Sequence, residues 1–171
     1  MEEIELFHIS CDDYPSGYIV PLPEVTLYHQ NAIDNGLGWI DNYLDSLKPT
    51  NAPSRSRTFY AFGNIQHCLS FFNSRICETG SKRLYKVTME NPVSAPMCLT
   101  DGLKNNGEGH IINKAIAEEY WNSKNEWKVL EYLSEKMQIL EDITTSINGF
   151  PQFGNFIYRE DQILRNQLFN C

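Results

Sequence analysis

Apolar and polar residues alternate in several short stretches of this chain, which is the pattern of β-strands that bury one face. In residues 4–9 the alternation places Ile4, Leu6 and His8 on one face, and residues 84–89 alternate in the same way. The other predicted strands are residues 58–62, 127–133 and 137–143.

Other stretches repeat their apolar residues at intervals of three and four, which predicts amphipathic helices. Residues 31–47 form one such helix, although Gly36 and Gly38 weaken it. Asn64 is a suitable N-cap for a helix that starts at Ile65. Two more helices are predicted, through 112–122 and over 158–169.

Proline and glycine mark the connections between these elements. They predict loops over 11–26, 48–56 and 149–154, and Pro92 and Pro96 interrupt the chain before Met97. Strands and helices are mixed without regular βα alternation, which favours an α+β fold over a doubly wound sheet. A length of 171 residues suits a single domain, residues 1–171, with its own core.

Glu131 is the most informative residue of the predicted strand 127–133. It shares a face with Trp127, Val129 and Leu133. A carboxylate among apolar neighbours costs free energy unless it is paired, hydrogen-bonded or facing a cleft, and clefts are where carboxylates do chemistry. Two structural alternatives are a strand-end glutamate that points to solvent and one that is paired with an arginine.

The composition is that of a globular protein, with 42% hydrophobic and 21% charged residues. No apolar run approaches the ~18 residues of a membrane span, and Met1-Glu2-Glu3 lacks the basic start of a signal peptide. We therefore expect a cytoplasmic protein without membrane contact. The net charge of −8 disfavours a passive nucleic-acid-binding surface but leaves open an enzyme that handles one nucleotide at a time.

The cysteines argue against a disulfide framework and against a zinc knuckle, because their count is odd and they form no C-x-x-C pair. They are Cys11, Cys68, Cys77, Cys98 and Cys171, and we expect them to be reduced. The scattered histidines give no metal motif, so no metal site is predicted. Cys68 lies beside His67, but both fall on one predicted helix, where adjacent side chains point apart.

Two further candidate sites precede Glu131 in the sequence. His8 lies on the apolar face of the first strand, where a lone histidine is more often a satisfied core residue. Arg55 and Arg57 stand at the entrance of the strand 58–62 and suit bidentate binding of a phosphate. The alternative for the two arginines is a solvated loop.

The order of these pieces resembles the ADP-ribosyltransferase superfamily over residues 4–143. The opening L-F-H-I-S, followed by a Gly/Pro loop, looks like the first strand of the branch whose catalytic set is His-Tyr-Glu. The block F-Y-A-F-G-N, then a helix, then R-L-Y-K-V-T-M is similar to that group's second strand, helix and third strand. W-K-V-L-E-Y-L and M-Q-I-L-E-D-I resemble the segment that presents the catalytic glutamate, with its partner strand.

The resemblance implies split β-sheets flanked by helices, with NAD+ as the substrate and no metal. It makes Glu131, Tyr60 and Arg55 the catalytic residues. It places the cofactor on a further set of side chains: His8, Ser10, Arg57, Phe59 and Tyr60. Val129 stands where the arginine-modifying branch has a glutamate or glutamine that helps select the acceptor, and the chain has no Ser-Thr-Ser motif after the second strand.

The function implied is NAD-dependent mono-ADP-ribosyl transfer to a macromolecule, with a nucleic-acid base (RNA or DNA) slightly favoured over a protein or a small molecule. Small bacterial relatives of this kind include toxins of toxin–antitoxin and phage-defence systems, which implies an antitoxin protein as partner. The alternatives are a catalytically inactive module that binds NAD or a partner and, more remotely, a Cys or His hydrolase. Residues 144–171 lie outside the resemblance. Their helix carries Tyr158, Ile163, Leu164 and Leu168 as an apolar set, either packed on the domain or exposed as a docking surface.

Overall fold

The computed structural model describes residues 4–72, 77, 80–149 and 156–170, and its strands form one antiparallel sheet in the order β2-β7-β4-β1-β3-β6-β5. The strands are β1 (Leu6–Ser10), β2 (Ile19–Val20), β3 (Phe59–Phe62), β4 (Arg83–Met89), β5 (Val93–Pro96), β6 (Leu130–Ser134) and β7 (Met137–Asp142). The helices are α1 (Leu27–Asp34), α2 (Gly38–Ser46), α3 (Ile65–Phe72), α4 (Cys98–Asn106), α5 (Asn113–Trp121) and α6 (Phe156–Phe169), with a 3-10 turn η1 (Thr144–Gly149). The chain is thus an α+β protein, as the sequence predicts.

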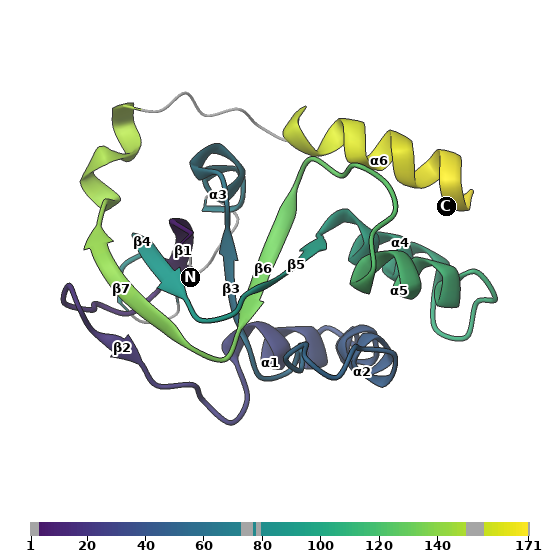
Figure 1. Cartoon of the computed structure of the whole chain (residues 1–171), viewed down its shortest axis with the longest axis horizontal. Coiled ribbons are helices and arrows are strands. Elements are labelled where there is room, and N and C mark those ends of the chain that lie inside the picture. The colour runs from purple at the N-terminus through teal and green to yellow at the C-terminus, as the bar shows by residue number, and fades with distance from the viewer. Residues whose placement is uncertain (1–3, 73–76, 78–79, 150–155, 171) are drawn as a thin grey trace.

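The sheet has two halves that meet at the junction of β1 and β3. Within the described residues, Phe7 and Phe62 are the one residue pair that joins these strands, whereas β1 and β4 pair from Leu6 to Ser10. The strands β3, β6 and β5 then lead away toward the helical side of the molecule (Figure 1). Because β1 and β3 part beyond Phe7, side chains that follow it in β1 reach the gap between the two halves.

Helices surround the second half of the sheet, with α1 and α2 below it in the view and α4, α5 and α6 beside it (Figure 1). One core lies between α2, α4, α5 and α6 and the strands β5 and β6. Its largest fully buried side chains include Leu44, Leu99, Leu103, Ile116 and Tyr120. A second core lies on the first half of the sheet, around Leu6, Val87 and Ile139. A third core, around Phe62 and Leu69, fixes α3 against β1 and β3.

The alternation that predicts the strand of Glu131 is confirmed in its burial, although regular pairing begins only at Leu130. Trp127, Val129, Glu131 and Leu133 are all buried, whereas Lys128 is exposed and Tyr132 is half-buried. The predicted cap of α3 is also confirmed, since Asn64 Oδ1 accepts hydrogen bonds from the backbone N–H groups of Gln66 and His67.

Three local predictions are corrected by the structure. The helix predicted over 31–47 is two helices, because the chain turns at Gly36, whose φ of 72° suits glycine. The loop 11–26 contains the short strand β2, which pairs with β7. The interruption at Pro92 and Pro96 contains β5, an edge strand where the missing N–H of proline is tolerated, and α4 follows at once.

Two further corrections concern cysteine and the last helix. Cys11 and Cys77, predicted to be reduced, form a disulfide, while the thiols of Cys68 and Cys98 are buried. The helix α6 packs on the domain, but not through its whole predicted apolar set, because Ile163 and Leu168 are exposed. The predicted loop over 149–154 lies, apart from Gly149 in η1, outside the described residues.

Besides the packing of Tyr158 and Leu164 on the core, two buried charged residues hold α6. Asp161 is 1% exposed, and its carboxylate accepts hydrogen bonds of 2.8 Å from the backbone N–H groups of Lys128 and Val129. Arg165 donates through Nη1 to the carbonyl of Cys98 at 3.0 Å. The C-terminal helix therefore fixes the backbone that leads directly into Glu131. A sequence pattern of apolar residues does not reveal this, because polar side chains make the contacts.

Candidate functional site

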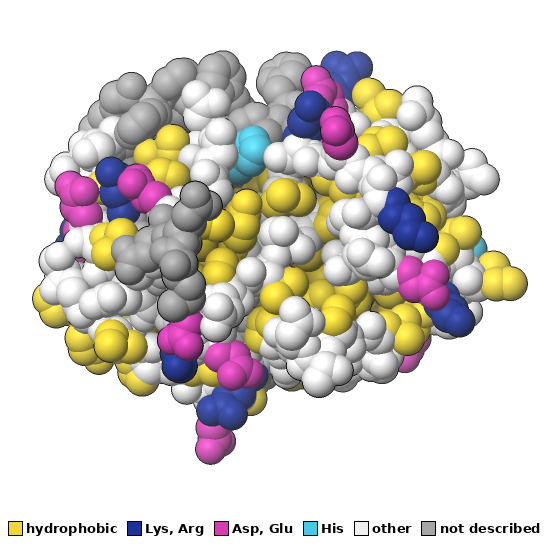
Figure 2. Space-filling model, in the orientation of Figure 1, with side chains coloured by type: hydrophobic (Ala, Val, Ile, Leu, Met, Phe, Trp, Pro, Cys, Tyr) yellow, Lys and Arg dark blue, Asp and Glu magenta, His cyan; other side chains and the backbone are white. Residues whose placement is uncertain are grey.

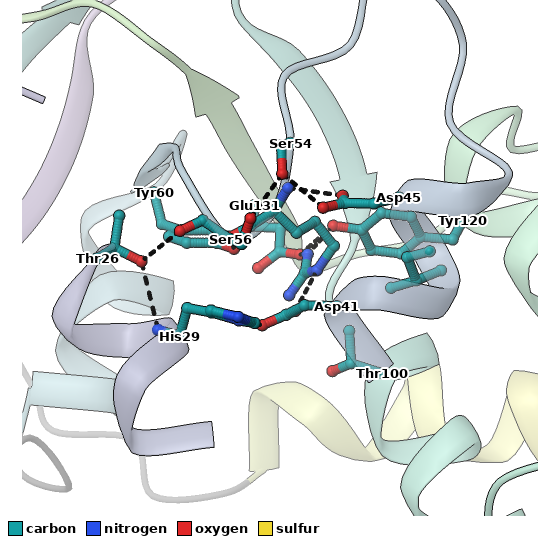
Figure 3. A network of polar contacts seen from close by, with 12 residues as sticks. Thr26, His29, Asp41, Asp45, Ser54, Ser56, Tyr60, Thr100, Tyr120 and Glu131 are labelled. Carbon is teal, nitrogen blue, oxygen red and sulfur yellow. Dashed lines mark hydrogen bonds and ion pairs between the residues drawn. The ribbon is translucent and has the colours of Figure 1, made fainter. Parts of the chain in front are cut away.

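The loop before β3 carries Arg55 into the interior of the protein. Asp45, at the end of α2, holds this loop: its carboxylate accepts the backbone N–H of Arg55 at 2.7 Å and the hydroxyl of Ser54 at 2.5 Å (Figure 3). Arg55 is consequently 0% exposed, which is unusual for an arginine unless its charge is paired.

Arg55 is paired with two carboxylates from different elements. Its Nε donates to Asp41 Oδ1 of α2 at 2.8 Å, and its Nη1 donates to Glu131 Oε1 of β6 at 2.5 Å. Nη1 also contacts the hydroxyl of Tyr120 from α5, and that hydroxyl donates to Glu131 Oε1 at 2.5 Å. Asp41 and Glu131 are 2% and 3% exposed, so both ion pairs are buried.

The network continues from Asp41 to α1. His29 donates through Nδ1 to Asp41 Oδ2 at 2.7 Å and is itself buried. Thr26, the N-cap of α1, accepts the backbone N–H of His29 and so starts the helix at the position that aims this imidazole at Asp41. The turn at Gly36, which breaks the predicted long helix, folds α1 against α2 and brings His29 and Asp41 together (Figure 3).

The electrostatics of this cluster keep the guanidinium charged and the phenols neutral. Burial alone would lower the pKa of Arg55, but Glu131, Tyr120, Tyr60 and Asp41 raise that pKa well above its usual value. Burial raises the pKa of both Tyr60 and Tyr120 well above 10.0. Both tyrosines are therefore hydrogen-bond donors at neutral pH, and Tyr60 donates its hydroxyl to the carbonyl of Arg55 at 2.6 Å.

The two carboxylates differ in how much of their hydrogen-bonding capacity is used. Asp41 uses both oxygens, one for Arg55 and one for His29. Glu131 uses Oε1 for both of its hydrogen bonds with the described residues. Its other oxygen, Oε2, is left for another partner, which is the arrangement that a ligand-binding carboxylate requires.

A pocket opens where β1 and β3 part. Its volume is about 280 Å³, and its walls include His8, Ser10, Phe59, Tyr60 and Tyr28. His8 donates through Nδ1 to the backbone carbonyl of Tyr60 at 2.6 Å, so this side chain bridges the two strands beyond their last residue pair. The ring centroids of Tyr28 and Tyr60 lie 4.9 Å apart, and the two rings form an aromatic corner of the pocket.

A second pocket, of about 220 Å³, shares Tyr28 with the first as a lining residue. Arg55 and Asp41 line this pocket, together with Thr100, Asp101 and Lys104 of α4. Tyr28 borders both pockets. Because Arg55 lines the second pocket and binds Glu131 directly, one guanidinium group connects that pocket to the carboxylate.

The structure brings most of the predicted site residues together in two groups. Glu131, Arg55 and Tyr60 meet in the buried network, and the pocket between β1 and β3 gathers His8, Ser10, Phe59 and Tyr60. Arg57 is exposed and borders neither of the two pockets. Glu131 is paired with an arginine, one of the two structural alternatives for this residue, and Arg55 does not lie in a solvated loop.

Sequence reasoning missed several members of the site: Tyr28, His29, Asp41, Asp101 and Tyr120. Asp41 lies in the stretch Trp39-Ile40-Asp41, where a charge beside apolar residues of a helix resembles an ordinary surface position. A signal was nevertheless present, because Asp41 lies three residues before the buried Leu44 on the same face of α2.

Within the described residues, no group of three or more histidine, cysteine or acidic side chains is arranged to hold a metal ion. No helix in the part of the chain that the structure describes is long and apolar enough to cross a membrane. In comparisons with known proteins, no protein-family model and no curated protein matches the sequence. The function is therefore argued from the two pockets and the charged network between them.

Proposed function

We propose that this chain is an NAD-dependent mono-ADP-ribosyltransferase that acts on a macromolecular acceptor. The observation that carries the proposal is the position of Tyr60, which lines the pocket between β1 and β3 and also donates its hydroxyl to the backbone of Arg55, the partner of Glu131. Tyr60 thus links the pocket to the network that holds Glu131, although the carboxylate itself does not line the pocket.

In the proposed reaction, the bond between nicotinamide N1 and ribose C1′ breaks, and its electron pair leaves with neutral nicotinamide. Positive charge develops on the ribose, as in glycoside hydrolysis. Glu131 Oε2 would accept a hydrogen bond from the ribose 2′-hydroxyl and stabilise that charge. Arg55 and Tyr120 hold Oε1 and so fix the carboxylate in place before the substrate arrives.

The remaining residues of the pocket have roles in binding NAD. Tyr60 would stack on the nicotinamide ring, while His8 and Ser10 face the ribose or adenosine part. Arg57 lies outside the pocket, exposed at the entrance of β3, and would contact the phosphates where they reach the surface. The single residue pair between β1 and β3 supports the split-sheet arrangement that we infer for the fold, because it opens the sheet at this pocket.

The surface bears on the nature of the acceptor. On the face shown in Figure 2, hydrophobic side chains gather in the middle, and side chains of both charges lie mostly toward the edges. With a net charge of −8, the chain is poorly suited to tracking a nucleic-acid backbone. Val129 in place of the acceptor-selecting glutamate or glutamine, together with the basic loop of Arg55 and Arg57, favours a nucleic-acid base over a protein. We therefore propose modification of single nucleic-acid bases first and of a protein second, in a cytoplasmic toxin that an antitoxin protein restrains.

A non-catalytic NAD-binding module is the second candidate. It is favoured by the burial of Glu131, which is 3% exposed and ion-paired in the manner of a structural residue. Such a module would bind NAD in the same pocket and release no nicotinamide.

The test is nicotinamide release from labelled NAD, with total protein, RNA and DNA offered as acceptors. We expect the wild type to label one class of acceptor and Glu131→Gln to lose the label, with turnover reduced about 100-fold or more. Glu135→Gln, an exposed neighbour with the same change of charge, is the matched control and is expected to behave as wild type. NAD binding without turnover by the wild type would overturn the transferase and leave the binding module.

A further inference from the structure

The second pocket holds a carboxylate that the proposed reaction has not used. Asp101 lies in the first turn of α4 and lines this pocket together with Arg55. It is partly buried, and it forms no hydrogen bond with the described residues. The pocket's other carboxylate, Asp41, has both oxygens engaged, so Asp101 is the one of the two that is available to a ligand.

The position of the pocket relative to Glu131 follows from Arg55. Nη1 of Arg55 is 2.5 Å from Glu131 Oε1, and the same side chain forms part of the pocket wall. Tyr28 lines both this pocket and the one between β1 and β3. A ribose held by Glu131 would lie near Arg55, which lines the same pocket as Asp101, with nicotinamide on the side of Tyr60.

We propose that the second pocket binds the acceptor and that Asp101 is the general base that removes its proton. This inference rests on the proposed function and deepens it, because it assigns the acceptor to a chemical class: a neutral nucleophile that carries an exchangeable proton, such as a hydroxyl, an amine or a ring N–H. An acceptor that is already anionic, such as a carboxylate, would need no such base.

The surroundings of Asp101 suit this role. Burial raises the pKa of the Asp101 carboxyl, and the charge of Glu131 adds to this effect. The positive charges of Arg165 and Lys104 lower the same pKa, but burial is the largest influence, and the pKa is raised. A higher pKa makes a carboxylate a stronger base toward the acceptor proton. Lys104, three residues along α4 and also lining the pocket, offers a donor to the same acceptor.

The chemistry balances without a further reagent. The acceptor atom forms a bond to C1′ as the N1–C1′ bond breaks, nicotinamide leaves with that electron pair, and the acceptor proton passes to Asp101 and then to solvent. Methanol and azide are probes that separate the transfer of the acceptor proton from the attack on C1′ and the loss of nicotinamide. Methanol must lose a proton when it attacks C1′, whereas azide, an anion, has none to lose.

The experiment incubates the full chain with NAD in mixtures of methanol and azide and measures the ratio of azido-ADP-ribose to methyl-ADP-ribose. For Asp101→Asn we expect this ratio to rise at least about ten-fold over wild type, because general-base catalysis typically contributes 10²- to 10⁴-fold. The matched control is Glu108→Gln, an exposed carboxylate beyond the end of α4, for which the ratio is expected to equal that of wild type.

A ratio is insensitive to the amount of folded enzyme, so partial loss of stability in Asp101→Asn does not imitate the result. An unchanged ratio in Asp101→Asn, with products formed from both nucleophiles, would overturn the base and leave the proposed transferase intact. Absence of any NAD consumption by the wild type would overturn the transferase itself and, with it, this inference.

Discussion

Glu131 and Arg55 are 76 residues apart in the sequence, yet Oε1 of the one accepts a 2.5 Å hydrogen bond from Nη1 of the other in the interior of the protein. Each of these charges is tolerated because the other is present. Asp41 binds Nε of the same guanidinium at 2.8 Å, and His29 continues the chain of contacts. The arrangement joins β6, the loop before β3 and the first two helices into one polar unit.

The stability of the fold is expected to depend on this unit. Arg55→Leu leaves Asp41 and Glu131 buried without their partner, and we expect the free energy of unfolding to fall by about 3–5 kcal/mol. Lys136→Met, which breaks the exposed pair with Glu90, is the control and should change the same quantity by about 1 kcal/mol or less. Urea denaturation measures both.

The coupling between Arg55 and Glu131 is tested by the double variant. If the two side chains act as a pair, the losses of unfolding free energy are not additive. The double variant Arg55→Leu with Glu131→Gln should then lose about 1–3 kcal/mol less than the sum of the losses in the two single variants. Strict additivity would show that the 2.5 Å contact between these side chains contributes nothing to folding.

Tyr28 is expected to control the binding of NAD, because it lines both pockets and its ring lies 4.9 Å from that of Tyr60. Tyr28→Ala removes one wall of the aromatic corner, and we expect the Kd for NAD to rise roughly five- to ten-fold. Tyr28→Phe keeps the ring and should remain within about three-fold of wild type.

Calorimetric titration in the Glu131→Gln background measures this Kd without turnover. Ile33→Ala, at an exposed position of the same helix, is the control. Equal affinities for Tyr28→Ala and Ile33→Ala would place the nucleotide away from the shared wall of the two pockets.

Asp161 is expected to stabilise the segment that leads into Glu131. Asp161→Ala leaves the backbone N–H groups of Lys128 and Val129 without acceptors, at a cost of about 2–4 kcal/mol in unfolding free energy. Hydrogen exchange of these two amides should accelerate in the variant. Glu160→Ala, exposed on the same helix, is the comparison, and slow exchange retained in Asp161→Ala would show that α6 is not what holds this segment.

Glu119 gives a prediction for the acid side of the stability profile. Burial raises its pKa, but hydrogen bonds from Trp127, Asn125 and the backbone of Lys124 outweigh burial, and the pKa lies below the usual 4.5. A carboxyl whose pKa is lowered by folding contributes stability above its unfolded pKa, and that contribution is lost as pH falls through the folded value.

The wild type should therefore lose more stability than Glu119→Gln between about pH 5 and about pH 3, while Glu119→Gln is the less stable protein near pH 7. Thermal unfolding across this range measures the difference. Glu118→Gln, an exposed neighbour, should lose stability with falling pH as steeply as wild type does. If the stabilities of wild type and Glu119→Gln fell in parallel over this pH range, a lowered pKa of Glu119 would be contradicted.

Local patterns allowed much of the fold to be predicted. The strands around Tyr60, Val87 and Glu131 and the helix capped by Asn64 follow from periodicity and capping, which depend on neighbouring residues alone. The predictions failed where a single residue changed the direction of the chain, as at Gly36, or where distant chain segments meet. The pairing of Cys11 with Cys77 is an example of the second kind.

For the site, the sequence by itself identified Glu131 as a carboxylate in an apolar pattern and selected Arg55, Tyr60 and His8 as candidates for partners. The tertiary structure decided which of them meet: Arg55 turns inward to Glu131, whereas Arg57 remains in solvent. It also added Asp41 and Asp101. The physical reason is that periodicity records which face of an element is buried, whereas the pairing of charges depends on where separate elements come to lie in space, and that is set only when the core packs.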